Sequence, residues 1–188
     1  MILQLVKTKQ DKEKVKFIVN NYHSYVPSES SVGRRIDFII YDDDRFSVLG
    51  MISAGSSVYP PPKDMIKRMK VSKNEYKAIF NSVANNRKFC LIVKRKNLGT
   101  QVLKQFRKLL QVEWKKKYGD DLKYLVTFVG DGHNGAMYKA DNWEHVGYTS
   151  GLPKHESSSM KWHTSAELKE KFVKPTGENK KMIFIKEL

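Results

Sequence analysis

Side chains that could move protons or bind a metal stand at two places in the sequence. Tyr22 and His23 follow the first predicted helix, while Asp131 lies in a glycine-rich turn at 130–135 and Tyr138 follows that turn. Imidazole, carboxylate and phenolate groups suit a metal with open coordination positions. They equally suit metal-free chemistry, with His23 or Asp131 as general base and Tyr138 as general acid. The sequence contains no paired metal motif such as H-E-x-x-H, so the spacing leaves both readings open, along with a packed core tyrosine and ordinary surface histidines.

A basic segment precedes the longest predicted helix and could bind phosphate. Its sequence at 94–100, Lys-Arg-Lys-Asn-Leu-Gly-Thr, joins an apolar strand to the helix. Free amides and the helix dipole make such a junction an anion site, although a plain turn that needs a glycine would look the same. The residues expected to bind a phosphorylated cofactor are Arg95, Asn97, Leu98, Gly99 and Thr100.

The charge balance points to a polyanionic partner. Lys and Arg number 35 against 20 Asp and Glu, which gives a net charge of +15 and a pI near 9.7. Such a chain attracts nucleic acid, anionic membranes or phosphorylated cofactors, and the alternative is a lysine-rich surface that serves solubility alone. If the partner is DNA, we expect its phosphates to be contacted by Arg34, Arg35, Lys94 and Lys96. We expect Trp143 to stack on a base that is extruded from the duplex.

Cysteine usage and hydropathy exclude several classes of protein. Cys90 is the only cysteine, so an intrachain disulfide and a zinc-finger framework are excluded. It lies in the apolar run 89–93, which favours a packed thiol over a nucleophile. No apolar stretch approaches the ~18 residues of a membrane span, and the N-terminus becomes charged too soon for a signal peptide. We therefore expect a soluble, cytoplasmic protein without a membrane partner.

Hydrophobic periodicity predicts the elements that must position these groups. A helix is predicted over 97–118, where one apolar stripe is formed by Leu103, Phe106, Leu110 and Trp114. Shorter helices are predicted over 11–20, twice within 63–85, and in the segment that ends at 138. Strands are predicted over 2–7, 35–41, 46–54, 88–94, 122–129, 145–151 and 182–185. This order predicts a mixed central sheet with helices on both faces, in a single domain over 1–188 whose residues 151–188 are a β-rich C-terminal extension packed on it.

The order of elements resembles the acyl-CoA-dependent N-acetyltransferase (GNAT) fold. GNAT enzymes place a Q/R-x-x-G-x-G/A loop at the junction matched here by 94–101, with Arg95 and Gly99 one residue further apart than in that pattern. They also place a tyrosine on a short helix before the next strand, which 136–147 matches with Tyr138. The resemblance implies that the loop binds the CoA pyrophosphate and that the Tyr138 hydroxyl protonates the leaving thiolate.

A narrower resemblance lies in residues 127–143, with the sequence Thr-Phe-Val-Gly-Asp-Gly-His-Asn-Gly-Ala-Met-Tyr-Lys-Ala-Asp-Asn-Trp. This segment is similar to the G-H-x-G-x-x-Y-x-A-x-N-W block of Mom-type phage DNA-modification proteins. It is also similar to a related bacterial family of unknown activity found beside transposons and phage-defence genes. Residues 22–23, 87–89 and 96–100 align in the same order, so the resemblance covers roughly residues 15 to 150.

The Mom resemblance implies conversion of adenine N6 in double-stranded DNA to N6-carbamoylmethyladenine, which protects phage DNA from restriction in the host cytoplasm. It implies acetyl-CoA as donor, iron held by His23, Asp131 and Tyr138, and Tyr22 as a further catalytic residue. The donor could also be another molecule. The alternatives are a GNAT enzyme that acts on a protein or small amine, and a non-catalytic basic module for DNA binding or defence. The oligomeric state stays open, a homodimer included.

Overall fold

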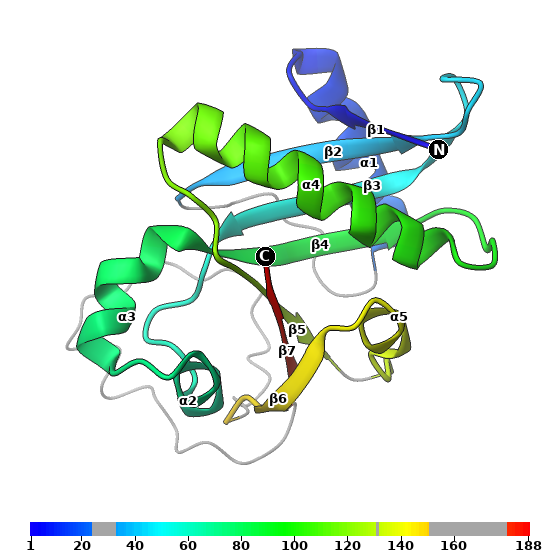
Figure 1. The fold of residues 1–188 in the computed structure, drawn as a ribbon. Helices are drawn as coiled ribbons and strands as arrows, with labels where there is room; N and C mark the ends of the chain where they lie inside the picture. Colours follow the sequence, from blue (N-terminus) through cyan, green and yellow to red (C-terminus); the bar gives the residue numbers. More distant parts are fainter. Residues whose placement is uncertain (24–32, 131, 151–179) are drawn as a thin grey trace, which may run out of the picture.

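The computed structural model describes residues 1–23, 33–130, 132–150 and 180–188, and the structural statements below concern those residues. They form one seven-stranded sheet in the order β1-β2-β3-β4-β5-β7-β6 (Figure 1). The pair β4–β5 is parallel and the other neighbouring pairs are antiparallel. The strands are β1 (Ile2–Leu5), β2 (Arg35–Tyr41), β3 (Val48–Ser56), β4 (Val83–Leu91), β5 (Tyr124–Val129), β6 (Glu144–Tyr148) and β7 (Met182–Glu187).

Helices cover both faces of this sheet, which confirms the predicted fold class. One face carries α4 (Leu98–Tyr118) and the short α5 (Ala136–Ala140), and α4 lies in front of the sheet in Figure 1. The opposite face carries α1 (Lys9–Tyr22) over one part and α2 (Lys63–Met69) with α3 (Lys73–Ile79) over another. A 3₁₀ turn, η1 (Phe80–Ser82), leads from α3 into β4. No helix among the described residues is both long and apolar enough to cross a bilayer.

The apolar stripe of α4 builds the largest part of the core, because its spacing places every member on the helix face that meets the sheet. Each of its four predicted side chains is fully buried, and Phe106 meets Phe38 of β2 edge to face with ring centroids 5.8 Å apart. The helix ends at Gly119, whose φ of 78° is the left-handed conformation that glycine adopts without steric cost. Cys90 packs beneath α1, and burial raises the pKa of its thiol, so it is the packed thiol that the sequence predicts.

The position of β4 differs from the expectation. The apolar run predicted a strand over 88–94, whereas β4 occupies Val83–Leu91 and the chain has left the sheet before residue 94. The middle of the strand carries four polar residues in succession at 85–88, which break the hydrophobic pattern. These polar residues lie at the centre of the sheet, so their presence needs a local explanation that the site below provides.

The last strand lies inside the sheet. β7 pairs with β5 on one side and β6 on the other, both antiparallel. The segment predicted as a C-terminal extension therefore supplies an interior strand, while its residues 151–179 lie outside the described part of the chain. As a result β6 joins the sheet through residues more than thirty positions later in the sequence.

Candidate functional site

The parallel strands β4 and β5 stay paired over only three residues and then diverge. Their ladder joins Val83–Asn85 to Tyr124–Val126, after which β4 continues along β3 and β5 continues along β7. The register between β3 and β4 also shifts here, because Ser53 faces Lys88 while the next residue, Ala54, faces Asn86. Arg87 is therefore the extra residue of a β-bulge, a feature that redirects side chains next to functional sites. We call this region the β4–β5 divergence.

A buried polar network fills the α4 side of the β4–β5 divergence. The Tyr138 hydroxyl on α5 donates to Asn86 Oδ1 at 2.8 Å, and Thr127 Oγ1 donates to the Asn86 carbonyl at 3.1 Å. The amide nitrogen of Asn86 donates in turn to the Ser53 carbonyl at 2.9 Å. Burial raises the pKa of Tyr138 to about 12, although the hydrogen bond with the Thr127 side chain acts to lower it. Tyr138 therefore keeps its proton at any physiological pH.

On the α1 side, His23 lies near Lys88 and His133, two residues that are far from it in the sequence. It follows α1 directly, and its pKa is lowered first by burial, then by the charge of Lys88 on β4 and by His133 in the turn after β5. The fold therefore places His23 within electrostatic reach of His133 in the glycine-rich turn. A lowered pKa keeps the imidazole neutral near pH 7, which is the form that accepts a proton.

The other members of the predicted acid–base set are placed differently. Tyr22 is half exposed and lies edge-on to Phe17 of the same helix, with ring centroids 6.5 Å apart. Asp131 lies outside the described residues. Among the residues that are described, no three His, Cys, Asp or Glu side chains come close enough to hold a metal ion. The iron site, which counted on Asp131, stays a prediction.

The N-terminus of α4 offers backbone amides next to the divergence. Asn97 precedes the helix in a left-handed conformation with φ of 60°, and its side chain makes no capping hydrogen bond. Thr100 Oγ1 donates to the Asn97 carbonyl at 2.9 Å, and Leu98 points into the core, so only the backbone of this turn could bind an anion. Gly99 allows close packing of α5, because a Cβ there would lie 2.2 Å from Met137 Sδ and that side chain would have to shift.

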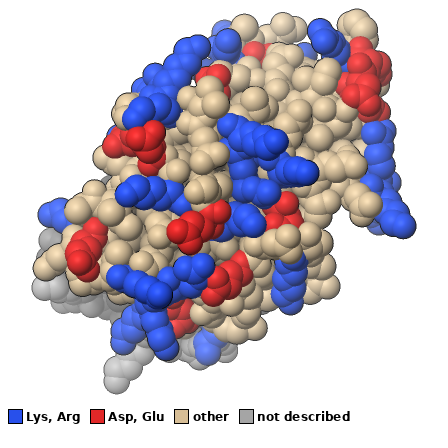
Figure 2. All heavy atoms as spheres, viewed as in Figure 1, with Lys and Arg blue, Asp and Glu red and all other residues tan. Residues whose placement is uncertain are grey.

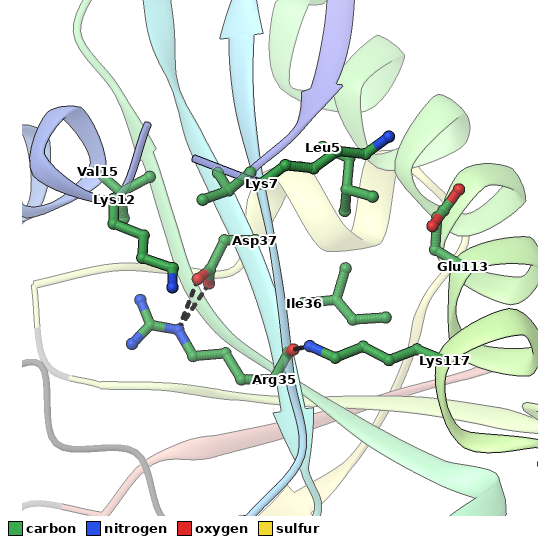
Figure 3. A pocket seen from close by; sticks show the side chains of 10 residues that line it. Leu5, Lys7, Lys12, Val15, Arg35, Ile36, Asp37, Glu113 and Lys117 are labelled. Carbon is green, nitrogen blue, oxygen red and sulfur yellow. Dashed lines mark hydrogen bonds and ion pairs between the residues drawn. The ribbon is translucent and has the colours of Figure 1, made fainter. Parts of the chain in front are cut away.

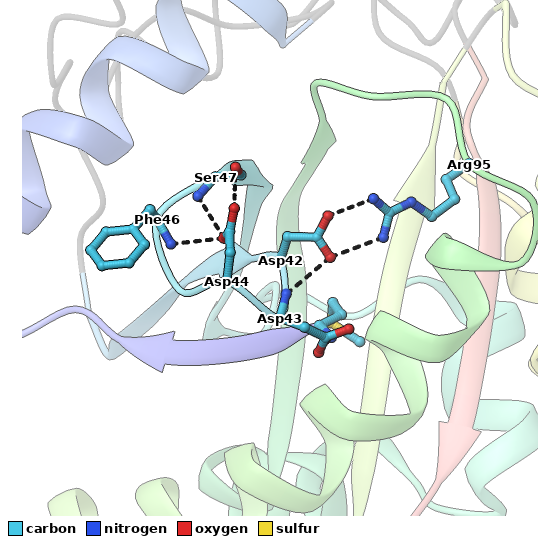
Figure 4. Close-up of polar contacts among 7 residues, drawn as sticks. Asp42, Asp43, Asp44, Phe46, Ser47 and Arg95 are labelled. Carbon is cyan, nitrogen blue, oxygen red and sulfur yellow. Dashed lines mark hydrogen bonds and ion pairs between the residues drawn. The ribbon is translucent and has the colours of Figure 1, made fainter.

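The basic loop before α4 is exposed, and one of its cations is engaged. Arg95 forms a two-pronged contact with Asp42 in the β2–β3 turn, at 2.6 and 3.1 Å (Figure 4). This hydrogen-bonded guanidinium lowers the pKa of Asp42 to about 2. An exposed pair of this kind contributes little to stability, so a ligand phosphate could replace Asp42 at low cost. Lys94 and Lys96 flank Arg95 on the surface.

The residues expected to contact DNA differ in how accessible they are in the structure. Arg34 pairs with Asp120 at 2.5 Å and lies 4.7 Å over the Tyr118 ring. Trp143 is only 3% exposed and donates from Nε1 to Asp141 at 2.9 Å, so its ring belongs to the core and offers no free face for a base. On the α4 face, basic groups are interspersed with acidic ones rather than gathered in one patch (Figure 2).

Arg35 lines a pocket of about 480 Å³ where β1 ends and the edge of β2 continues (Figure 3). Its Nε donates to Asp37 at 2.8 Å, and Lys117 Nζ from α4 donates to the Arg35 carbonyl at 2.9 Å. The polar members of the lining are mainly cationic, namely Lys7, Lys12, Arg35 and Lys117, with Asp37 and Glu113.

Sequence reasoning missed the polar residues of β4 that surround the divergence. Asn86 organises the network around Tyr138, and Lys88 lies near His23. Asn85, at the last paired position, has a buried Oδ1 that accepts no hydrogen bond in the described structure. The available signal was the uninterrupted polar run at 85–88 directly before an apolar run, since such a run inside a central strand is unusual unless the strand carries a site.

The fold is that of the GNAT acetyltransferases, as comparison with solved structures establishes. Mosquito arylalkylamine N-acetyltransferase-like 5b is 13% identical with a TM-score of 0.52 and covers 100% of both chains. Arabidopsis thaliana NAA60, in complex with a bisubstrate analogue, is 10% identical with a TM-score of 0.54, over 99% of this chain and 98% of the other. Drosophila melanogaster polyamine N-acetyltransferase is 8% identical with a TM-score of 0.52, over 100% of both chains.

Sequence comparison is more specific about the family. No functionally curated protein is significantly similar to this chain. The family profile described as Druantia protein DruA matches residues 1–184, nearly the whole sequence. The family that matches is thus DruA and not the Mom-type proteins to which the 127–143 segment is similar. The chain belongs to the DruA family.

Proposed function

We propose that the protein is an N-acetyltransferase that transfers an acyl group from acetyl-CoA to an amine, in the service of a defence system. The observation that carries the proposal is the β4–β5 divergence beside the uncapped N-terminus of α4, in a chain with the GNAT fold. The defence role is taken from the family, because DruA is a defence-system protein. When bound, acetyl-CoA supplies an activated acetyl thioester.

The residues around α4 fit the phosphates of CoA. Backbone amides of the first turn and the positive end of the helix dipole favour an anion, and no side chain of Asn97 competes for them. Lys94, Arg95 and Lys96 add positive charge in the exposed loop before the helix. Gly99 keeps this turn free of a side chain, so α5 and its tyrosine can pack directly against it.

The two faces of the divergence supply a proton donor and a proton acceptor. Tyr138, with a pKa of about 12, retains a hydroxyl proton that can be given to a departing sulfur. On the other face, neutral His23 can take a proton from the nitrogen of the acceptor amine. The unpartnered Asn85 Oδ1 is suited to accept an N–H of the same amine, because a buried acceptor gains most from a donor that arrives with the substrate.

The test measures thiol release from acetyl-CoA by the purified full chain with a polyamine, a lysine peptide and a mononucleotide as acceptors. We expect release with one acceptor class, its loss in His23→Gln, and its retention in Lys104→Gln, a change on the exposed side of α4. CoA should also raise the melting temperature, because a ligand that binds only the native state stabilises it. Absence of both effects at millimolar CoA would contradict the proposal.

A second candidate is that the acceptor is adenine N6 in DNA, as in the Mom-type reaction. The observation in its favour is the net charge of +15, which is awkward for a cationic amine acceptor but suits a polyanion. The described residues do not fit the iron that the Mom resemblance implies, because Tyr138 keeps its proton on the α4 side of the divergence while His23 lies on the α1 side. Mass spectrometry of nucleosides from plasmid DNA of cells that express wild type or Tyr138→Phe tests it. A heavier deoxyadenosine with wild type only would support DNA modification, and unmodified DNA with soluble wild-type protein would count against it.

A further inference from the structure

A strip of polar side chains crosses the sheet on the face that carries α1, between two apolar clusters. One cluster packs under α1 and the other under α2 and α3. The strip between them, which we call the polar strip, comprises Arg35 and Asp37 of β2, Ser53 of β3, and Asn85, Arg87 and Lys88 of β4.

Strand alternation places these side chains on one face. Ile39 and Met51 point toward α1, so Asp37 and Ser53, two residues away on their strands, share that face. The bulge brings Arg87 to the same side, because its Cδ lies 2.6 Å from the position that a Cβ on Gly55 would occupy. The absence of a side chain at Gly55 thus lets the Arg87 stem lie across β3 toward Arg35.

Arg87 is the exceptional member of the polar strip. It is half-buried, and its guanidinium makes neither a hydrogen bond nor an ion pair within the described structure. Burial lowers the pKa of Arg87, and Arg35 lowers it further, while Asp37 only partly opposes them. Asp37 is already held by Arg35 at 2.7 Å. A partly desolvated cation without its own counterion is costly, and an anionic ligand would relieve that cost.

The polar strip continues into the pocket at the β2 edge. Arg35 and Asp37 line that pocket together with Lys7, Lys12 and Lys117. Neighbouring strands lie about 4.8 Å apart, so Arg87 on β4 and Arg35 on β2 originate about 10 Å from each other. The cations therefore form a row long enough for more than one phosphate.

We propose that the polar strip binds consecutive phosphates of a nucleic-acid strand, with one phosphate on the Arg87 guanidinium and the next toward Arg35 and the β2-edge pocket. A guanidinium suits this role because its fork of N–H donors matches two phosphate oxygens. The strip also leads to Asn85 and Lys88 at the β4–β5 divergence, and so would present an amine on the strand to His23. That last role rests on the proposed function, whereas phosphate binding does not.

The test is fluorescence anisotropy of the full chain with a short labelled oligonucleotide, without CoA, over a series of salt concentrations. We expect Arg87→Gln to weaken binding at least about tenfold and to reduce the salt slope by about one. Lys104→Gln removes the same charge from the opposite face and should change affinity by less than about twofold. Arg87→Gln should melt no lower than wild type, because it removes an unpaired half-buried charge.

Three outcomes would overturn the proposal. Wild-type affinity in Arg87→Gln would exclude the site, and equal losses in Arg87→Gln and Lys104→Gln would reduce binding to overall charge. Competition by inorganic phosphate or a mononucleotide as effective as that by unlabelled oligonucleotide would point to a small-anion site instead of a strand. Loss of acetyl transfer in every assay, with the Arg87 effect intact, would refute the proposed function and leave the polar strip standing.

Discussion

Tyr138→Phe removes one buried hydroxyl, and the cost can be worked out from its contacts. The substitution deletes the 2.8 Å hydrogen bond to Asn86 Oδ1 and leaves that acceptor buried without its donor. An unsatisfied buried group of this kind costs about 1–3 kcal/mol. For a chain of 188 residues, each kcal/mol lowers the melting temperature by about 2–4 °C, so we expect a decrease of about 2–12 °C.

The same hydroxyl gives the effect a pH signature. Tyr138 has a pKa of about 12 in the folded protein against 10.0 for an ordinary tyrosine, so the folded state holds the proton more tightly. The resulting stabilisation, about 2–3 kcal/mol, is fully present below pH 10 and is lost as pH rises from 10 toward 12. The stability difference between wild type and Tyr138→Phe should therefore be constant near neutrality and shrink above pH 10.

The assay is urea unfolding followed by tryptophan fluorescence at pH 7 and at several pH values above 9. Tyr148→Phe is the matched control, because Tyr148 is 53% exposed and its change should stay within about 0.5 kcal/mol. Adding Asn86→Ala completes a double-mutant cycle, with an expected coupling of about 0.5–3 kcal/mol. Equal midpoints for wild type and Tyr138→Phe, or no coupling to Asn86, would refute the network as described.

Three further predictions follow from contacts near the site. Gly99→Ala places a methyl group 2.2 Å from Met137 Sδ, so the free energy of unfolding measured by calorimetry should fall by about 1–3 kcal/mol. Adding Met137→Ala should restore part of this stability. An unchanged free energy of unfolding in Gly99→Ala would contradict the close packing of α4 and α5. If His23 is the base, the acid limb of the kcat/KM profile should lie below pH 6.5, and a limb at or above 6.5 would exclude it. Arg95→Gln should raise the pKa of Asp42 from about 2 toward 3.8 in a carboxyl NMR titration. A lowered carboxyl pKa stabilises the fold above pH 3.8 and loses this effect as pH falls toward 2, so the contribution of the ion pair is present at pH 7 and is removed in Arg95→Gln. Because the pair is exposed and screened by water, stability at pH 7 should fall only slightly. An unmoved Asp42 titration would contradict the ion pair.

Local patterns were enough to predict much of the fold. The i, i+3, i+7, i+11 stripe of α4 identified its buried face, because one helix contains the whole signal. The β-rich residues of 35–41 predicted the strand β2, and in the turn that follows it Asp44 accepts from the amides of Phe46 and Ser47. Both signals are carried by residues close in sequence.

Features that depend on distant residues could not be predicted in the same way. The polar run of β4 hid the strand, since Asn86 is satisfied by partners on α5, β3 and β5 that no local pattern indicates. Trp143 resembled an exposed stacking residue by type alone, whereas Asp141 and the Tyr138 ring hold it in the core. No local pattern indicated that Arg87 lacks a counterion among the described residues, because the bulge and Gly55 are what place its side chain next to Arg35.

The interior position of β7 sets an order of assembly for a newly made chain. In the described sheet β6 lies at the edge and is held there by β7, which the ribosome makes after both β5 and β6. Until residue 184 has emerged, Tyr138 also lacks the Phe184 ring that stacks on it at 5.7 Å. The elements β1 to β4 and α4 thus precede β7 in synthesis, while the packing around Tyr138, the proposed proton donor, is completed last. A chain whose β7 has not yet been made therefore lacks both this ring contact and the strand that joins β5 to β6.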